Sequence, residues 1–422
     1  MRLGRKDESP QKPRVLYVVT SAVTTRLLRG QLAAVSRAGF EVWIASAPGA
    51  ELNQCALAEG STPVAIPMHR EPSPLADLRA LAKLWLEMRR IRPVVTNVGT
   101  PKAGLLGGLA AWFSRVPCRV YTLRGLRWET TRGWKRQILL AADWLACRMA
   151  HRVICVSASV RDRAVAVGIV KQDKTVVFGA GSSNGVDAAR FAPLPERLAH
   201  ARALRRELGI PPGAPVIGFI GRLTRDKGVG DLIEAHARLS QRWLELRLIL
   251  VGNAESGDLL PDHAAARIRG TPHVLRIGHA EDVAPLYHLM DVLALPSHRE
   301  GFPNVVLEAG AAEKPVVATR ATGTVDAVVD GVTGLLVPVG DATALAGALE
   351  LVLGDPEFAA GLGSAGRARV LAEFSQEHIW EALIAGYRAM LGSCEASSPR
   401  VAAAVHGIES PRSGKSVPGY TP

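Results

Sequence analysis

Two short segments of the sequence combine glycines and cations, which suit a phosphate-binding site, with carboxylates, which could bind hydroxyl groups. The first follows an apolar run that ends at Ile220 and reads GRLTRDKG over residues 221–228. A turn at Gly221 would let the backbone approach a phosphate, a helix start would supply free N–H donors, and Arg222 and Lys227 could neutralise a diphosphate. The spacing is not that of the P-loop, GxxxxGK followed by Ser or Thr. Taken alone, the segment is also compatible with a solvated basic turn.

The second segment reads SHREGFPNVVLE over residues 297–308 and directly follows an apolar run at 292–295. Pro303 suits the first position of a helix, because proline has no N–H to leave unpaired there. The backbone N–H groups of Asn304 and Val305 would then be free to meet an anion. This segment is therefore expected to form a second anion-binding helix start.

Two glutamates of this second segment could have separate roles. Glu300 would lie on the loop before the helix, where it could reach a sugar hydroxyl. Glu308 would lie more than one turn into the helix, where it could accept hydrogen bonds from ribose hydroxyls. Glutamates eight residues apart are common by chance, so the pair alone is also compatible with surface helix charges.

The elements that would position these segments follow an α/β pattern. Short β-branched runs alternate with longer helical patterns throughout the chain, which indicates parallel sheets. A break at 191–195 and a stop signal at Pro211–Gly213 divide the pattern into two halves. We expect two doubly wound domains that face one another by the carboxyl ends of their strands, where open sheets bind ligands. The expected strands are 14–19, 41–45, 93–97, 119–122, 152–156 and 175–178, then 215–220, 247–251, 274–277, 292–295, 315–318 and 334–337.

The ends of the chain differ from this pattern. Residues 1–13 are polar and basic, and Ser, Pro, Gly and Ala dominate after residue 391, so both ends are expected to be disordered. No run approaches the roughly 18 apolar residues of a membrane span, and no secretory signal is recognisable. A cytoplasmic location is therefore expected. The expected organisation is a disordered N-terminus (1–13), an N-terminal domain (14–190), a C-terminal domain (191–374), a helix capped by Ser375 (375–391) and a disordered tail (392–422).

The charge of the chain is unevenly distributed. Residues 1–190 carry 29 Lys and Arg against 13 Asp and Glu, and the remainder carries 22 against 26, so +16 and −4 give the net charge of +12. Such an excess indicates an anionic partner, and the absence of nucleic-acid-reading motifs favours a lipid surface over nucleic acid. A high-GC genome would also enrich arginine. The membrane-facing candidates are Arg127, Arg132, Lys135 and Arg136, interleaved with Trp128 and Trp134.

Metal and nucleophile chemistry have no recognisable signature. The five cysteines form no CxxC pair, and no DxD carboxylate pair flanked by apolar residues appears. We also find no Ser/His/Asp or Cys/His arrangement. The sequence therefore predicts no metal site, no required cofactor and no protein nucleophile.

Several motifs together resemble glycosyltransferase family 4. They are the Gly-Arg-x4-Lys-Gly segment, Glu300 and Glu308 with seven residues between them, and GVTGLLVP at 331–338. The segment SNGVD at 183–187 matches an interdomain linker of the family, and 374–380 resembles its closing helix. The resemblance covers about residues 14–391. It implies the GT-B fold, in which two Rossmann-like domains face each other across a cleft and a C-terminal helix returns to the N-terminal domain.

The resemblance also implies roles for residues of the C-terminal half. Glu300 would contact the donor sugar, Glu308 would bind the ribose, and Arg222 and Lys227 would hold the diphosphate. Glu300, Arg222 and Lys227 would be the catalytic residues. The donor-binding residues would be Gly221, Arg222, Lys227, Gly252, Gly278, Phe302, Pro303, Asn304, Val305 and Glu308.

In the N-terminal half, TPKAG at 100–104 and VYTLRG at 120–125 are similar to enzymes that build capsule, O-antigen and lipid-linked glycans. Lys102 and Arg124 would bind the acceptor, although Lys102 is equally compatible with a solvated lysine. The chain departs from the family at three positions. It has no glycine-rich loop at 20–26, it has Arg124 where histidine is frequent, and it has Asp326 where glutamate is commoner.

The predicted activity is retaining transfer of a hexose or N-acetylhexosamine from a nucleotide-diphosphate sugar, with a UDP-sugar favoured. The acceptor would be a polyprenyl-diphosphate-linked saccharide in surface polysaccharide or glycan biosynthesis. The enzyme would lie peripherally on the inner face of the bacterial cytoplasmic membrane. The alternatives are an epimerase or phosphorylase of the same architecture and a non-catalytic nucleotide-sugar-binding protein.

Overall fold

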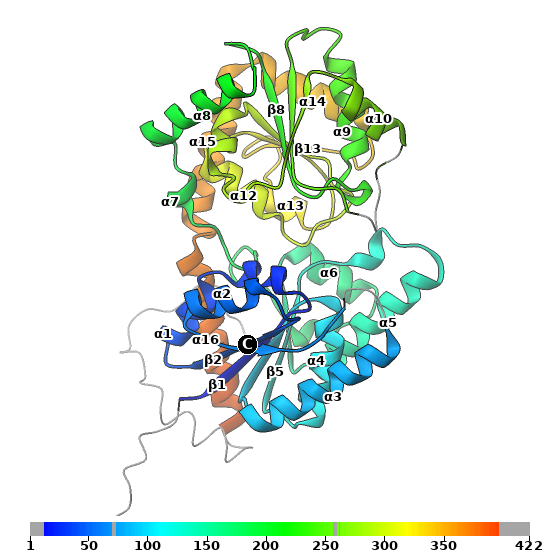
Figure 1. Cartoon of the computed structure of the whole chain (residues 1–422), viewed down its shortest axis with the longest axis vertical. Helices are drawn as coiled ribbons and strands as arrows, with labels where there is room; N and C mark the ends of the chain where they lie inside the picture. The colour runs from blue at the N-terminus through cyan, green and yellow to red at the C-terminus, as the bar shows by residue number, and fades with distance from the viewer. Residues whose placement is uncertain (1–11, 70–72, 256–259, 261, 396–422) are drawn as a thin grey trace, which may run out of the picture.

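The chain forms two domains, each built around one parallel sheet with helices on both faces (Figure 1). The computed structural model describes residues 12–69, 73–255, 260 and 262–395. Within these ranges no helix is both long enough and apolar enough to cross a membrane. The predicted α/β class and the two doubly wound domains are confirmed.

The sheet of the first domain has seven strands in the order β3-β2-β1-β4-β5-β6-β7. Six of them lie where the sequence pattern predicts them. The pattern missed β3 (Thr62–Ala65), which has a proline and three exposed residues of four because it lies at the sheet edge. The other strands are β1 (Arg14–Val18), β2 (Glu41–Ser46), β4 (Val95–Val98), β5 (Cys118–Leu123), β6 (Arg152–Cys155) and β7 (Thr175–Val176).

The sheet of the second domain has six strands in the order β10-β9-β8-β11-β12-β13. Counted within the domain, this is the Rossmann order 3-2-1-4-5-6, whose topological switch point lies between the first and fourth strands. The switch point therefore falls between β8 and β11. The strands are β8 (Val216–Ile220), β9 (Arg247–Val251), β10 (Val274–Gly278), β11 (Val292–Leu295), β12 (Val316–Thr319) and β13 (Leu335–Val337).

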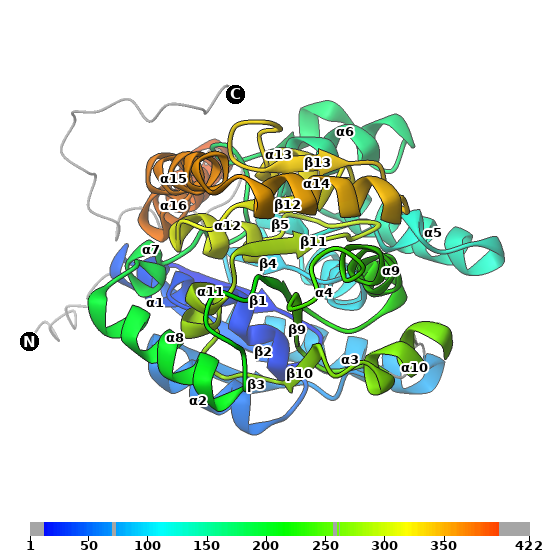
Figure 2. The ribbon, with the colours of Figure 1, turned by 90° about the horizontal axis from the view of Figure 1, so that it is seen from above.

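Helices cover both sheets, and Figure 2 shows the same elements from above. Those of the first domain are η1 (Ala22–Leu28), α1 (Gln31–Arg37), α2 (Ala50–Glu59), α3 (Pro74–Ile91), α4 (Pro101–Phe113), η2 (Arg127–Glu129), α5 (Gly133–Met149), α6 (Ala158–Ala166) and η3 (Gln172–Lys174). The remaining helices are α7 (Ala188–Phe191), α8 (Pro195–Glu207), η4 (Arg225–Lys227), α9 (Val229–Leu239), α10 (Asp262–Gly270), α11 (Ala284–Leu289), α12 (Asn304–Ala311), α13 (Thr324–Ala327), α14 (Ala342–Gly354), α15 (Pro356–Glu373) and α16 (Gln376–Glu395).

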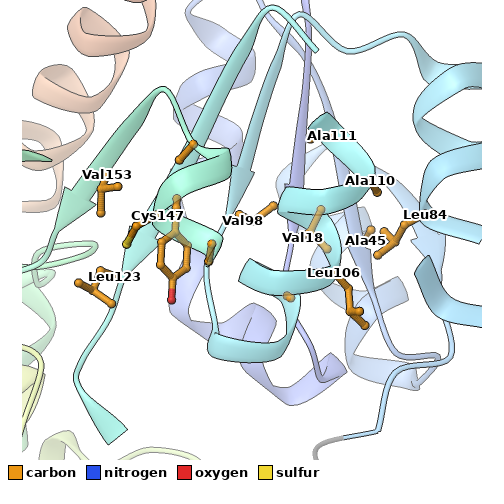
Figure 3. Close-up of a cluster of buried hydrophobic side chains, with 14 of the residues drawn as sticks. Val18, Ala45, Leu84, Val98, Leu106, Ala110, Ala111, Leu123, Cys147 and Val153 are labelled. Carbon is orange, nitrogen blue, oxygen red and sulfur yellow. The ribbon is translucent and has the colours of Figure 1, made fainter. Parts of the chain in front are cut away.

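Glycines let α4 lie close against the first sheet. Leu106, Ala110 and Ala111 of this helix share a buried cluster with residues of the sheet (Figure 3). A β-carbon at Gly104 would lie 2.5 Å from the Tyr121 ring, and one at Gly107 would lie 2.8 Å from Val98. The start of α4 is thus held at the carboxyl end of β4.

The chain crosses between the domains twice, near residue 186 and near residue 374, and the two crossing segments lie side by side. Val186 donates its N–H to the carbonyl of Phe374 at 2.9 Å, and a β-carbon at Gly185 would lie 2.7 Å from that carbonyl oxygen. Trp380 in α16 donates to Asn184 in the linker at 2.7 Å, which ties both crossings together.

Helix α16 follows the second crossing and returns to the first domain (Figure 1). As predicted, Ser375 caps it, accepting from the N–H of His378 at 3.2 Å. Tyr387 lies fully buried against the first sheet and accepts a hydrogen bond from Asn97 at 2.6 Å. The helix ends at Glu395, four residues beyond the expected end. The rest of the expected tail and residues 1–11 lie outside the described residues.

Candidate active site

The two segments singled out in the sequence lie beside each other at the switch point of the second sheet. One follows β8 and the other follows β11, which are adjacent strands. Gly228 has a φ of +67°, and a β-carbon there would lie 1.9 Å from the carbonyl oxygen of Pro296. Only glycine fits this contact, so Gly228 allows the two segments to pack together.

Lys227 and Glu300 meet between these segments. Lys227 Nζ lies 2.5 Å from Glu300 Oε1, and Ser297 donates its hydroxyl to the same oxygen at 2.7 Å. Both charged side chains are largely covered, with 18% of Lys227 and 11% of Glu300 exposed. The backbone N–H of Glu300 donates to Thr322 at 3.0 Å. The carboxylate is therefore held by its own loop and by a cation.

Asp226 contacts two arginines near this pair, Arg222 and Arg299. Its carboxylate accepts hydrogen bonds from Thr224 at 2.6 Å and from Arg299 at 2.7 Å, and it lies 3.4 Å from Arg222. Arg222 also pairs with Glu255. The sequence reasoning did not assign a role to Asp226 or Arg299. The sequence signal that could have identified Asp226 is that it is the single acid among the three cations of residues 221–228.

Glu308 lies apart from the Lys227 contact and has its own partner. Tyr287 is buried and donates its hydroxyl to Glu308 Oε2 at 2.6 Å. Burial raises the pKa of Glu308, and the Tyr287 hydrogen bond opposes this shift. The two glutamates therefore occupy different surroundings, as separate roles would require.

The start of α12 differs slightly from expectation. Asn304 is the first helical residue, so Pro303 precedes the helix as its N-cap instead of occupying its first position. The Pro303 carbonyl accepts from Val306 at 3.1 Å. The N–H groups of Asn304 and Val305 still fall in the first turn, where a helix leaves donors without intrahelical acceptors.

The side chain of Phe302 packs against the segments at which the chain crosses between the domains. Its ring lies 5.2 Å from that of Phe374, and a β-carbon at Gly181 would lie 3.0 Å from it. The Phe302 ring therefore links the Glu300 loop to the two crossing segments.

Three glycines lie at the carboxyl ends of three adjacent strands. Gly221 follows β8, Gly252 follows β9, and Gly278 is the last residue of β10. Gly252 has a φ of +133°, and a β-carbon there would lie 2.0 Å from the carbonyl oxygen of Gly221. The Gly252 N–H donates to the Gly278 carbonyl at 2.7 Å. The structure thus brings the ends of β8, β9 and β10 together through these glycines.

The two first-domain candidates have different surroundings. Lys102 forms an ion pair with Asp77 at 2.8 Å, so it is not simply a solvated lysine. Arg124 follows β5 and meets the second domain, since a β-carbon at Gly301 would lie 2.0 Å from the Arg124 carbonyl oxygen. Ser157 also donates to the Gly301 carbonyl at 2.9 Å. The Glu300 loop therefore lies directly against the first domain.

Among the residues that the structure describes, no group of three or more His, Cys, Asp or Glu side chains could hold a metal ion.

The fold and the site define a GT-B glycosyltransferase. A solved structure with the same architecture is HepE of Anabaena in complex with UDP-glucose, with a TM-score of 0.74 and 25% identity over 89% of this chain and 99% of that one. Sucrose-phosphate synthase of Thermosynechococcus elongatus has a TM-score of 0.74 and 21% identity, covering 90% of this chain and 100% of its own. The predicted GT-B fold is confirmed.

The chain belongs to glycosyltransferase family 4. The family described as "Glycosyltransferase Family 4" matches residues 23–190, and "Glycosyl transferases group 1" matches residues 214–355. The capsular polysaccharide biosynthesis glycosyltransferase CapM of Staphylococcus aureus is 34% identical over 382 residues, which cover 90% of this chain and 98% of that protein. The protein is therefore an enzyme, a glycosyltransferase, as the sequence predicted.

Proposed function

We propose that this glycosyltransferase moves a hexose or N-acetylhexosamine from a UDP-sugar to a polyprenyl-diphosphate-linked saccharide, with retention of anomeric configuration. The observation that carries the proposal is the contact between Lys227 and Glu300 at the switch point, beside Arg222. The UDP-glucose complex of HepE supports the choice of donor. The similarity to CapM supports an acceptor of surface polysaccharide biosynthesis.

The reaction would break the bond between the anomeric carbon and the β-phosphate oxygen, which leaves negative charge on the diphosphate and positive charge on the sugar ring. Arg222, Lys227 and the N–H groups at the start of α12 would stabilise the leaving group. Glu300 would contact the sugar, and Glu308 would bind the ribose. Gly221, Gly252 and Gly278 would frame the nucleotide.

The acceptor hydroxyl oxygen would form the new bond to the anomeric carbon, on the face that the diphosphate leaves. The proton of that hydroxyl would pass to the departing phosphate oxygen. This route uses no protein nucleophile and no metal. On the first domain, Lys102 and Arg124 would contact the acceptor.

The direct test supplies purified protein with UDP-hexoses, UDP-N-acetylhexosamines and a polyprenyl-diphospho-saccharide. We expect mass spectrometry to show a lipid heavier by one sugar residue, and NMR to show the anomeric configuration of the donor in the new linkage. An epimerised donor without a heavier lipid would instead identify an epimerase. Binding of UDP-sugar without any turnover would identify a non-catalytic binding protein.

We also propose that the enzyme binds reversibly to the anionic cytosolic leaflet through α4 and α5, which pack against each other. Arg127, Arg132 and Lys135 are exposed near the start of α5. Trp128, expected at the membrane surface, is instead fully buried, with Arg136 and Arg163 over its ring. The exposed large apolar side chains here are Trp112, Phe113, Trp134, Ile138 and Trp144.

Replacing Arg127, Arg132 and Lys135 together by glutamine is expected to weaken binding to anionic liposomes by about 100-fold, because each cation near such a surface contributes about 1 kcal/mol. Arg136 is left in place because it covers Trp128. Sedimentation with phosphatidylglycerol vesicles at two salt concentrations measures this, and added salt should weaken wild-type binding. The matched control replaces Arg202, Arg206 and Arg276, three exposed arginines of the second domain. Equal binding to neutral and anionic vesicles would contradict the proposal.

A further inference from the structure

Two nitrogen atoms of the Arg124 guanidinium donate no hydrogen bond to any residue that the structure describes. Its Nε and Nη1 atoms are buried, and no hydrogen-bond partner lies within reach among the described residues. The donor-site cations differ, since Lys227 is paired with Glu300, and Arg222 with Asp226 and Glu255. Burying a cation without a counter-ion is strongly unfavourable.

In the part of the chain that the structure describes, Arg124 forms no ion pair with a carboxylate. A β-carbon at Gly99 would lie 3.1 Å from Arg124 Nε and 3.6 Å from Nη2, so the guanidinium lies over the residue that follows β4. The acidic groups that act on it are the hydroxyls of Tyr17 and Tyr387, and burial raises the pKa of both. Burial lowers the pKa of Arg124 to about 10, which leaves it charged at neutral pH.

The position of Arg124 connects it to the proposed reaction. Its carbonyl oxygen contacts Gly301, the residue after Glu300, so its side chain starts where the two domains meet. The guanidinium then extends across the carboxyl ends of β5 and β4, the edge at which open sheets bind ligands. An anionic group at this edge would supply the missing acceptors, and a planar guanidinium suits a carboxylate or a phosphate.

We propose that Arg124 is a specificity-determining residue that binds an oxyanion of a substrate at the carboxyl ends of β4 and β5. This rests on the proposed function. The oxyanion has two possible sources. One is the diphosphate of the lipid-linked acceptor, as in the proposed function, and the other is the carboxylate of a hexuronic acid donor, which would replace the neutral donor sugar proposed above. An imidazole, frequent here in the family, would be mostly neutral above pH 7 and would not hold such a group equally well.

The test measures binding to the full-length protein by isothermal titration calorimetry. The probes are UDP, UDP-glucose, UDP-glucuronate and farnesyl diphosphate, and the variants are Arg124→Met and the control Arg37→Met, an exposed charge loss in the same domain. We expect Arg124→Met to weaken either UDP-glucuronate or farnesyl diphosphate at least tenfold and to leave UDP within twofold. The probe that loses affinity identifies the source of the oxyanion.

Affinities of both acidic probes within twofold of wild type, or no binding of either probe to wild type, would overturn the assignment. Failure of wild type to bind UDP would instead count against the proposed donor, while the farnesyl diphosphate arm still decides on Arg124. We expect the melting temperature of Arg124→Met to equal or exceed that of wild type, because an uncompensated cation is removed. Arg124→His, measured at pH 8, is the second neutral variant if the methionine variant does not fold.

Discussion

Replacing Lys227 by methionine is expected to lower kcat/KM for the donor by about 10³-fold. About 10- to 100-fold of this should appear as weaker UDP binding, because a charged hydrogen bond to phosphate is worth about 1.5–3 kcal/mol. The remainder should appear in kcat, because charge on the leaving diphosphate increases in the transition state. The substitution also leaves the largely buried Glu300 without its cation, so the carboxylate would repel the diphosphate.

The matched control is Arg225→Met, which removes an exposed cation two residues away in the same short helix η4. Calorimetric binding of UDP and steady-state kinetics measure both variants, and circular dichroism melting checks that each is folded. If Lys227→Met lost no more activity than Arg225→Met, the phosphate-binding role would be wrong.

The sequence predicted the strands well because buried strands of parallel sheets are apolar over their whole length. The strand β8 is an example, since all five of its residues are buried. Strand β3 has only one buried residue of four, and its sequence TPVA has no such signal. Edge position, which no local pattern reveals, explains the difference.

The site was predictable within each segment but not between segments. Spacing placed Arg222 and Lys227 on one loop and Glu300 on another, and the switch point brings these loops together. The Lys227 to Glu300 contact joins residues 73 positions apart, so no local pattern contains it. The burial of Trp128 is a similar case, because Arg163, from a separate helix, helps to cover it.

Replacing Glu300 by glutamine is expected to lower kcat by about 10²- to 10³-fold with a smaller effect on UDP binding. Glutamine has nearly the same shape, and its carbonyl oxygen can still accept from Ser297, which lies 2.7 Å from the present carboxylate oxygen. What it removes is the negative charge beside a sugar ring that becomes positive in the transition state. The control Glu313→Gln removes an exposed carboxylate two residues after the end of α12. A kcat within threefold of wild type would contradict the assignment.

The double variant Lys227→Met with Glu300→Gln separates a shared role from two independent ones. Groups in direct contact give non-additive effects, whereas independent sites add in free energy. Because Lys227 Nζ and Glu300 Oε1 lie 2.5 Å apart, we expect the double variant to lose less activity than the product of the two single losses. In Lys227→Met part of the loss comes from an unpaired carboxylate, and the second substitution removes that charge. A loss in the double variant equal to the product of the two single losses would show that the contact has no part in the reaction.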